Sequence, residues 1–366
     1  MIAPRLEVDL EAVRHNAHHL VTALGPRGIR VVGVTKAVMA WPAVATSLLE
    51  AGVAGLGDSR VENLRALRRS GISSPQVLIR SPMLSQVELV VRHADRSLNT
   101  EWRVLRALAA AATDHRADQA DRTDPAEHGV VLMVELGDLR EGIAVADVVE
   151  MAHDVQRLDG LTLAGLGTNL ACQSGVVPDQ AKMDELSALV EKVEASCGVE
   201  LAVVSGGNSA SLGWALTTDD VGRIDELRLG EAILLGVDPL DRRPIEGLRS
   251  DAFRVVAEVI EAKTKPVEPW GTLGQTAFGF RPAQERGAGT ARQVIVALGR
   301  QDVDPDGLVP PEGMTLRGAS SDHLIVEVGD HEVSVGDELH FRPDYSALLR
   351  AATSPFVAKE ASAPRG

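Results

Sequence analysis

Short apolar runs alternate with amphipathic segments from residue 31 to about residue 236. Eight of these runs have the length and the polar borders of buried strands. We predict strands at 31–35, 53–56, 76–79, 95–98, 130–135, 161–167, 201–205 and 226–229. Apolar residues repeat at helical spacing in the other segments, as at Leu186, Leu189, Val190 and Val193, so helices are predicted at 11–24, 40–51, 59–69, 100–112, 144–156 and 180–197.

Eight strand–helix units in this length predict an α/β fold, a (β/α)8 TIM barrel within residues 1–240. A doubly wound open sheet is the alternative that periodicity leaves open. After residue 240 the apolar runs are separated by Gly, Pro and Asp, which predicts a C-terminal all-β domain over residues 241–366. Residues 1–9 contain a strand-like run, Leu6–Asp9, that is a candidate strand of this β domain.

Two further segments are poor in apolar residues. Thr113–His128 is polar and charged, which predicts a flexible surface insertion before the fifth barrel strand. Ala358–Gly366 has the composition of a disordered tail.

Composition and charge narrow the classes of partner. The chain has 366 residues, 45% of them apolar, and a net charge of −15 with no basic stretch, which argues against nucleic acid or an anionic membrane as partner. No apolar run approaches a membrane span, and the first residues lack the apolar core of an export signal. The two cysteines, Cys172 and Cys197, form no metal or disulfide motif, and the histidines have no metal-ligand spacing. We therefore expect a cytoplasmic protein that acts on a small molecule and holds no metal.

Lys36 carries the clearest chemical implication. It follows the apolar run Val31–Val34, and the other five of the six lysines lie in polar contexts. Burial of an ammonium group is costly and lowers its pKa, which suits Schiff-base formation. The alternative is a strand-end lysine whose ammonium group reaches solvent.

Other polar residues follow the predicted strands, at the carboxyl ends where barrel active sites lie. They are Asp58, Ser59, Arg60, Arg140, Thr168, Asn169, the turn Ser205–Ser209 and the segment Arg228–Glu231. The glycine-rich turn offers N–H groups and a hydroxyl to a phosphate, although an ordinary capped turn has the same composition. With Lys36 for the imine, it suggests pyridoxal 5′-phosphate. For Asp58–Arg60 a structural turn and helix cap is the alternative.

At this point the motifs match a family. They are VGVTKA at 32–37, GDSRVENL at 57–64, ELGDLREGI at 135–143, GTNL at 167–170, SGGNSASL at 205–212, LRLGEAILLG at 227–236 and GASSDHLIV at 318–326. The chain resembles the alanine racemase family of fold-type III pyridoxal-phosphate enzymes over almost its whole length, and its alanine/ornithine racemase branch in particular.

The resemblance implies roles for single residues toward the cofactor. Lys36 matches the lysine that forms the internal aldimine and acts as one catalytic base. The positions that match phosphate contacts are Asn208, Ser209, Gly230, the backbone of Glu231, and Tyr345, the only tyrosine. Arg228 matches the arginine that faces the pyridine nitrogen, and because arginine keeps its proton that nitrogen stays unprotonated. Asn169 stands where the family has a ring-stacking histidine. A surface position is the alternative for Tyr345, and a surface ion pair for Arg228.

The resemblance also implies substrate contacts. Arg140 matches the arginine near the substrate carboxylate, with a loop salt bridge as the alternative. The family's second base, a tyrosine in a Gly-Tyr-x-Asp-Gly turn, is missing from Gly274–Gly279, and Met133 stands near the position of its carbamylated lysine.

The segment Ser320–His323 is the candidate replacement for the second base. Ser321 and Asp322 lie where related decarboxylases bind the distal ammonium group of a basic substrate, and His323 suits acid–base work near neutral pH. A β-turn with a strand histidine is the alternative. In this fold the segment serves the neighbouring subunit, which implies a homodimer with shared active sites.

From these matches we expect a homodimeric amino-acid racemase, with a basic amino acid such as ornithine as substrate and a two-base mechanism. A fold-type III decarboxylase and a non-catalytic pyridoxal-phosphate carrier are the alternatives. Carboxylate binding by Arg140 argues against the first, and the β domain against the second.

Overall fold

The structure is a computed structural model that describes residues 3–118, 127–279 and 289–361. The chain divides into two compact units, one of residues Glu11–Ser250 and one of Met1–Leu10 with Asp251–Gly366. Among the described residues no helix combines the length and apolar character needed to cross a membrane.

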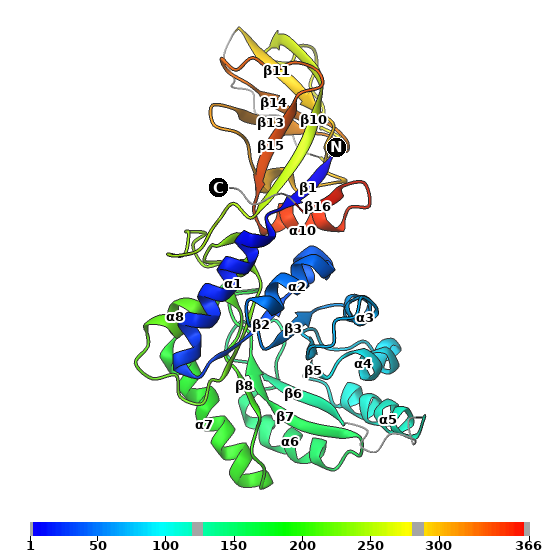
Figure 1. The fold of residues 1–366 in the computed structure, drawn as a ribbon, viewed down its shortest axis with the longest axis vertical. Helices are drawn as coiled ribbons and strands as arrows, with labels where there is room; N and C mark the ends of the chain where they lie inside the picture. The colour runs from blue at the N-terminus through cyan, green and yellow to red at the C-terminus, as the bar shows by residue number, and fades with distance from the viewer. Residues whose placement is uncertain (1–2, 119–126, 280–288, 362–366) are drawn as a thin grey trace. The chain divides into compact units, whose positions relative to one another are not determined.

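The first unit is a closed barrel of parallel strands surrounded by helices (Figure 1). Its strands are β2 (Arg30–Val34), β3 (Gly55–Asp58), β4 (Gln76–Leu78), β5 (Arg96–Asn99), β6 (His128–Val134), β7 (Leu161–Thr168), β8 (Val203–Ser205) and β9 (Glu226–Leu229). The last strand pairs with the first, Arg228 opposite Val32, so the barrel prediction is confirmed and an open sheet is excluded.

Helices follow the barrel strands in alternation. They are α1 (Leu10–Leu24), α2 (Pro42–Glu50), α3 (Val61–Arg69), α4 (Val87–His93), α5 (Trp102–Asp118), α6 (Val148–Gln156), α7 (Gln180–Cys197), α8 (Leu212–Thr217) and α9 (Glu231–Leu235). Helix α5 runs on to Asp118, so the prediction of a flexible insertion from Thr113 is wrong for its first residues. The part of that prediction at 119–126 lies outside the described residues, and the last residue of the predicted insertion, His128, begins β6 instead.

Apolar side chains fill the barrel, with one ion pair at its amino-terminal end. The cluster contains Val32, Val77, Leu98, Val131, Met133 and Val203. Arg96 at the start of β5 pairs with Glu226 at the start of β9. Because these strands lie on opposite sides of the barrel, the pair crosses its interior. The amino-terminal end is therefore closed by packing, and polar chemistry lies at the other end.

The second unit is built on an eight-stranded sheet. Its strands are β1 (Arg5–Val8), β10 (Phe253–Pro266), β11 (Thr290–Val296), β12 (Leu308–Val309), β13 (Thr315–Ala319), β14 (Leu324–Glu327), β15 (Glu338–Pro343) and β16 (Ala358–Ala361), with helix α10 (Tyr345–Thr353). The order β12–β15–β10–β11–β14–β13 is antiparallel throughout, and β1 lies between β10 and β16. Strand β16 corrects the prediction of a disordered tail for 358–361; residues 362–366 lie outside the described residues.

The division between the units falls ten residues after the predicted one. Residues 241–250 stay with the barrel because α1 holds them. Asn16 donates to the carbonyl of Arg249 at 2.8 Å and accepts from its N–H at 2.7 Å, and His15 bonds the carbonyl of Gly247 at 2.9 Å.

Candidate active site

The strand β2 delivers Lys36 to the carboxyl end of the barrel. Val34 is the last strand residue, and Lys36 begins a short 3-10 turn, Lys36–Val38. Burial lowers the pKa of the half-buried ammonium group, and the charges of Arg140 and Arg228 lower it further, against opposing effects of Cys172 and Asp58. No described residue forms a hydrogen bond or ion pair with its Nζ. A lysine in this state holds a neutral amine more readily than a surface lysine does.

Asp58 organises the turn that follows β3. The fully buried carboxylate accepts from the hydroxyl of Thr35 at 2.8 Å, from the N–H of Arg60 at 2.9 Å and from Asn63 at 3.0 Å. Burial raises its pKa, although these hydrogen bonds oppose the shift. Asp58 therefore stabilises the turn, which is the structural role given above as the alternative for Asp58–Arg60. The side chain of Arg60 is exposed.

Arg228 is a buried cation inside the barrel, on β9. It donates to the hydroxyl of Ser205, to the carbonyl of Thr168 at 2.9 Å and to Oδ1 of Asn169 at 3.4 Å. No carboxylate of the described residues pairs with it. Burial lowers its pKa to about 10, which leaves the guanidinium charged at neutral pH. A surface ion pair, the alternative for Arg228, is thus excluded.

The turn after β8 presents a hydroxyl beside two backbone N–H groups. Oγ of Ser209 accepts from the N–H of Gly230 at 3.3 Å and of Ala232 at 3.2 Å. A hydroxyl has two acceptor positions and one proton. Both acceptor positions are used, and no described residue accepts the proton, so it can be donated to an anion.

The glycine-rich sequence is required for this turn. Gly207 has φ +117°, and a Cβ there would lie 2.6 Å from Oγ of Ser211. Asn208 caps the next turn through its oxygen, which accepts from the N–H of Ala210 at 2.8 Å. Its amide nitrogen donates to Asn169 at 3.0 Å and to the carbonyl of Leu170 at 2.8 Å. Asn208 therefore acts through the turn and through Asn169.

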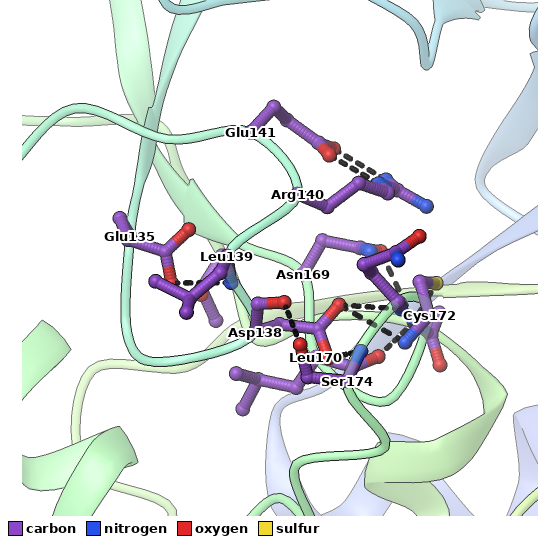
Figure 2. A network of polar contacts seen from close by, with 12 residues as sticks. Glu135, Asp138, Leu139, Arg140, Glu141, Asn169, Leu170, Cys172 and Ser174 are labelled. Atoms are coloured by element: carbon purple, nitrogen blue, oxygen red, sulfur yellow. Dashed lines mark hydrogen bonds and ion pairs between the residues drawn. The ribbon is translucent and has the colours of Figure 1, made fainter.

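Asp138 connects the loops that follow β6 and β7 (Figure 2). Its buried carboxylate accepts from the backbone N–H groups of Cys172 at 3.1 Å, Gln173 at 2.9 Å and Ser174 at 3.1 Å. Burial raises the pKa of Asp138, but these backbone donors outweigh burial and leave it below its ordinary value. The carboxylate thus fixes Cys172, whose Sγ accepts from Asn208 at 3.4 Å.

Arg140 lies on the loop after β6 and pairs with its neighbour Glu141 through two hydrogen bonds (Figure 2). The Glu141 carboxylate raises the pKa of the Arg140 guanidinium. The charges of Arg140 and Arg228 both lower the pKa of Lys36, so these three cations lie near one another at the carboxyl end of the barrel. The loop salt bridge expected as an alternative for Arg140 is present, in the vicinity of that site.

Four predicted site residues belong to the other unit. Ser321, Asp322 and His323 form the turn between β13 and β14, and Tyr345 begins α10. Oδ1 of Asp322 lies 2.8 Å from Nδ1 of His323 and accepts from Ser321 at 3.2 Å. Both side chains of the Asp322–His323 pair are exposed within their unit, and the hydrogen bond to His323 lowers the pKa of Asp322.

The barrel thus brings together Lys36, Arg140, Asn169, Asn208, Ser209, Arg228 and Gly230, while the backbone of Glu231 begins α9 beside them. No role was predicted from sequence for Asp138 or Cys172, and Ser205 was predicted only as the start of the glycine-rich turn. Asp138 stood inside ELGDLREGI and Cys172 two residues after GTNL, so position was the available signal.

This constellation suits a phosphorylated aldehyde. The Ser209 proton can meet an anion, because the N–H groups of Gly230 and Ala232 fill both acceptor positions of its hydroxyl. Lys36 supplies an amine with no described partner, and Arg228 is a buried donor with no described carboxylate partner. Asn169 adds a buried Nδ2 without a described partner. Among the described residues there is no group of three His, Cys, Asp or Glu side chains that could hold a metal ion. Fold and site define a barrel enzyme of the fold-type III class.

Comparison with known proteins gives the family. The alanine racemase N-terminal domain matches residues 8–239. The chain is 37% identical over 362 residues to the lysine racemase of Thermotoga maritima, covering 98% of both chains. It is 35% identical over 361 residues to the ornithine racemase of Acetoanaerobium sticklandii, covering 98% of this chain and 99% of that one. The chain belongs to the alanine racemase family, whose members depend on pyridoxal phosphate, and it is an amino-acid racemase, an isomerase.

Solved structures agree on the fold. An alanine racemase from Streptomyces lavendulae has a TM-score of 0.74 at 22% identity, covering 99% of this chain and 98% of that one. A D-threonine aldolase from Filomicrobium marinum has a TM-score of 0.71 at 19% identity, covering 96% and 88%. At these identities the likeness describes the architecture.

Proposed function

We propose that this protein racemises a basic amino acid, ornithine or lysine, with pyridoxal 5′-phosphate, by a two-base mechanism. The observation that carries the proposal is the amine of Lys36. It lies at the carboxyl end of the barrel with no described partner, and burial lowers its pKa. The extensive likeness to a lysine racemase and an ornithine racemase supports the substrate class.

The residues of the barrel would hold the cofactor in a defined way. Ser209 would donate its hydroxyl proton to the phosphate, while the N–H groups of Gly230 and Ala232 hold that hydroxyl in place and Asn208 shapes the turn. Arg228 would face the ring nitrogen and Asn169 the ring. When bound, pyridoxal phosphate withdraws electrons from the substrate and weakens the bond between Cα and its hydrogen. Because Arg228 keeps its proton and would not transfer it to the ring nitrogen, it would favour rapid return of a proton to Cα.

Proton transfer needs one acid–base group on each face of Cα. Lys36 is the proposed group on one face, since burial lowers its pKa and makes the neutral amine, the form that accepts a proton, more available. His323 is the proposed group on the other face, oriented by its hydrogen bond to Asp322. Arg140 would bind the substrate carboxylate through its planar fork. The Ser321–His323 turn would come from a second subunit, so the active form would be a homodimer.

Deuterium oxide separates the possible reactions. The protein is incubated with pyridoxal phosphate and each enantiomer of ornithine, lysine and alanine, and Cα deuteration, chirality and released carbon dioxide are measured. A racemase incorporates deuterium and inverts the centre without releasing carbon dioxide. A decarboxylase releases it, and a carrier does neither; either result contradicts the proposal.

The second base has its own test. His323→Ala should slow proton exchange for one enantiomer more than for the other, because each base removes the hydrogen from one face. Equal slowing of both enantiomers, or none, would remove His323 from this role.

A further inference from the structure

Arg140, the proposed binder of the substrate carboxylate, is already paired with the carboxylate of Glu141. Arg140 makes two hydrogen bonds to the carboxylate beside it in sequence, and the two side chains are 38% and 27% exposed. A substrate carboxylate that binds the same fork of Arg140 must displace Glu141. Substrate binding therefore leaves Glu141 without its cation.

The other carboxylates near the site are already committed to protein partners. Asp58 accepts from Arg60 and Asn63, and Asp138 accepts from the loop 172–174. Glu226, whose charge acts on Arg228, is paired with Arg96 across the barrel. Glu135, on the same loop as Arg140, accepts from the N–H groups of Gly137 at 2.5 Å and Leu139 at 3.1 Å. Glu231, at the start of α9, is paired with Arg242.

Glu141 differs from these carboxylates because its partner is Arg140, the arginine that the substrate carboxylate would take. Its described hydrogen bonds come from the flexible side chain of Arg140 and none comes from the backbone. It follows Arg140 on the loop after β6 and is hydrogen-bonded to it, and its charge acts on Arg228 as well. It can thus change partner without disturbing a turn.

We propose that Glu141 determines specificity for a diamino acid: it occupies Arg140 in the free enzyme and binds the distal ammonium group once the substrate carboxylate has taken Arg140. This inference rests on the proposed function and names the residue that selects its substrate class. It places the selection in the barrel unit, whereas Asp322 is engaged with His323.

Charge balance explains the selection. A diamino acid brings a carboxylate for Arg140 and an ammonium group for Glu141, so both partners of the broken pair are paired again. Alanine brings the carboxylate alone and leaves Glu141 without a cation at a partly desolvated position. A site rejects a ligand that leaves one of its charged groups unpaired.

Two unreactive ligands measure this effect without turnover. Pentanoate and 5-aminopentanoate have the same carbon chain, lack the α-amine and differ in the distal ammonium group. Their dissociation constants are measured by calorimetry on the enzyme loaded with pyridoxal phosphate and then reduced with borohydride, so that the distal amine cannot exchange into the cofactor's imine. Wild type should prefer 5-aminopentanoate by about fivefold, the range of a partly exposed ion pair.

Variants then locate the carboxylate. Glu141→Gln should abolish the preference and also tighten pentanoate binding, because no internal carboxylate competes for Arg140. Glu150→Gln, an exposed carboxylate on α6, is the matched control and should leave both constants unchanged. A merely structural role of Glu141 would weaken both ligands equally, which would overturn the inference.

The remaining outcomes are equally decisive. A preference that survives in Glu141→Gln and disappears in Asp322→Asn assigns the ammonium group to Asp322 and overturns the inference. Absence of any preference in wild type overturns it as well. Failure of the proposed function is seen separately, as a wild type that inverts no amino acid in deuterium oxide.

Discussion

Asp138→Asn tests how the loop of Cys172 is held in place. The carboxylate accepts three backbone N–H groups, two on Oδ2 and one on Oδ1. An amide in the same position keeps one acceptor oxygen, and its NH2 group faces a backbone N–H, so one hydrogen bond is lost and two lose their charge. Hydrogen bonds to a charged group contribute about 1.5–3 kcal/mol each, so local stability should fall by about 3 kcal/mol.

Hydrogen exchange of the loop amides is the assay, read by mass spectrometry on a peptide that covers residues 170–176. A loss of about 3 kcal/mol corresponds to roughly a hundredfold faster exchange, because 1.4 kcal/mol is a factor of ten. Asp179→Asn is the matched control. Asp179 caps α7 through one exposed bond to the N–H of Lys182, and asparagine caps equally well, so its peptide should change little.

Protection of the loop amides from exchange should also depend on pH. Because the pKa of Asp138 is lowered in the folded chain, the protection is complete above the ordinary aspartate value and is lost as pH falls through the lowered value. Unchanged exchange in Asp138→Asn, or the same change in both variants, would refute the assignment of this loop to Asp138.

Three further predictions concern other buried groups. Lys36→Met should abolish attachment of pyridoxal phosphate that borohydride makes permanent, read by mass spectrometry; attachment at another lysine would contradict the role. The same substitution should raise the free energy of unfolding of the cofactor-free protein near neutral pH, because burial disfavours the Lys36 charge. This gain should vanish above the ordinary lysine pKa, where Lys36 is neutral in both the folded and the unfolded chain. Burial lowers the pKa of His128 to about 4, so this residue should cost wild type about 3 kcal/mol of stability as pH falls from 6.5 to 4. His128→Gln should reduce the dependence of stability on pH measured by urea unfolding. An identical dependence in the variant would exclude His128 as its source. Gly207→Ala should destabilise the protein by about 1–3 kcal/mol and weaken cofactor binding, whereas Gly213→Ala, with open space and helical backbone, should stabilise slightly; equal effects in thermal unfolding would contradict the strain at Gly207.

The barrel could be predicted from the sequence because its strands are short apolar runs that stay buried on both faces. Lys36 could be singled out for the same reason, as a charge directly after such a run. The second unit was harder, since β10 spans fourteen residues with one polar, exposed face, and β16 contains Lys359 and Glu360. Alternating polar residues in an edge strand give the same composition as a loop.

The network around Asp138 could not be predicted, because its meaning depends on contacts distant in sequence. Asp138 stands among charged residues that look solvent-exposed, and its three donors come 34–36 residues later. A salt bridge of Arg140 was expected as an alternative. The partners of the neighbouring carboxylates, however, are given only by the hydrogen bonds and ion pairs of the structure.

Strand β1 is made before the segment Glu11–Ser250, whereas its partners β10 and β16 are made after that segment. Its buried Arg5 pairs with Glu7 of the same strand, with Glu338 of β15 and with Glu360 of β16, so two of these three carboxylates are made after the barrel. Translation order therefore delays this sheet until the barrel segment has been made, and the nascent chain carries an open strand edge until then. Premature termination after the barrel would leave that edge exposed, so truncated products should aggregate or be degraded.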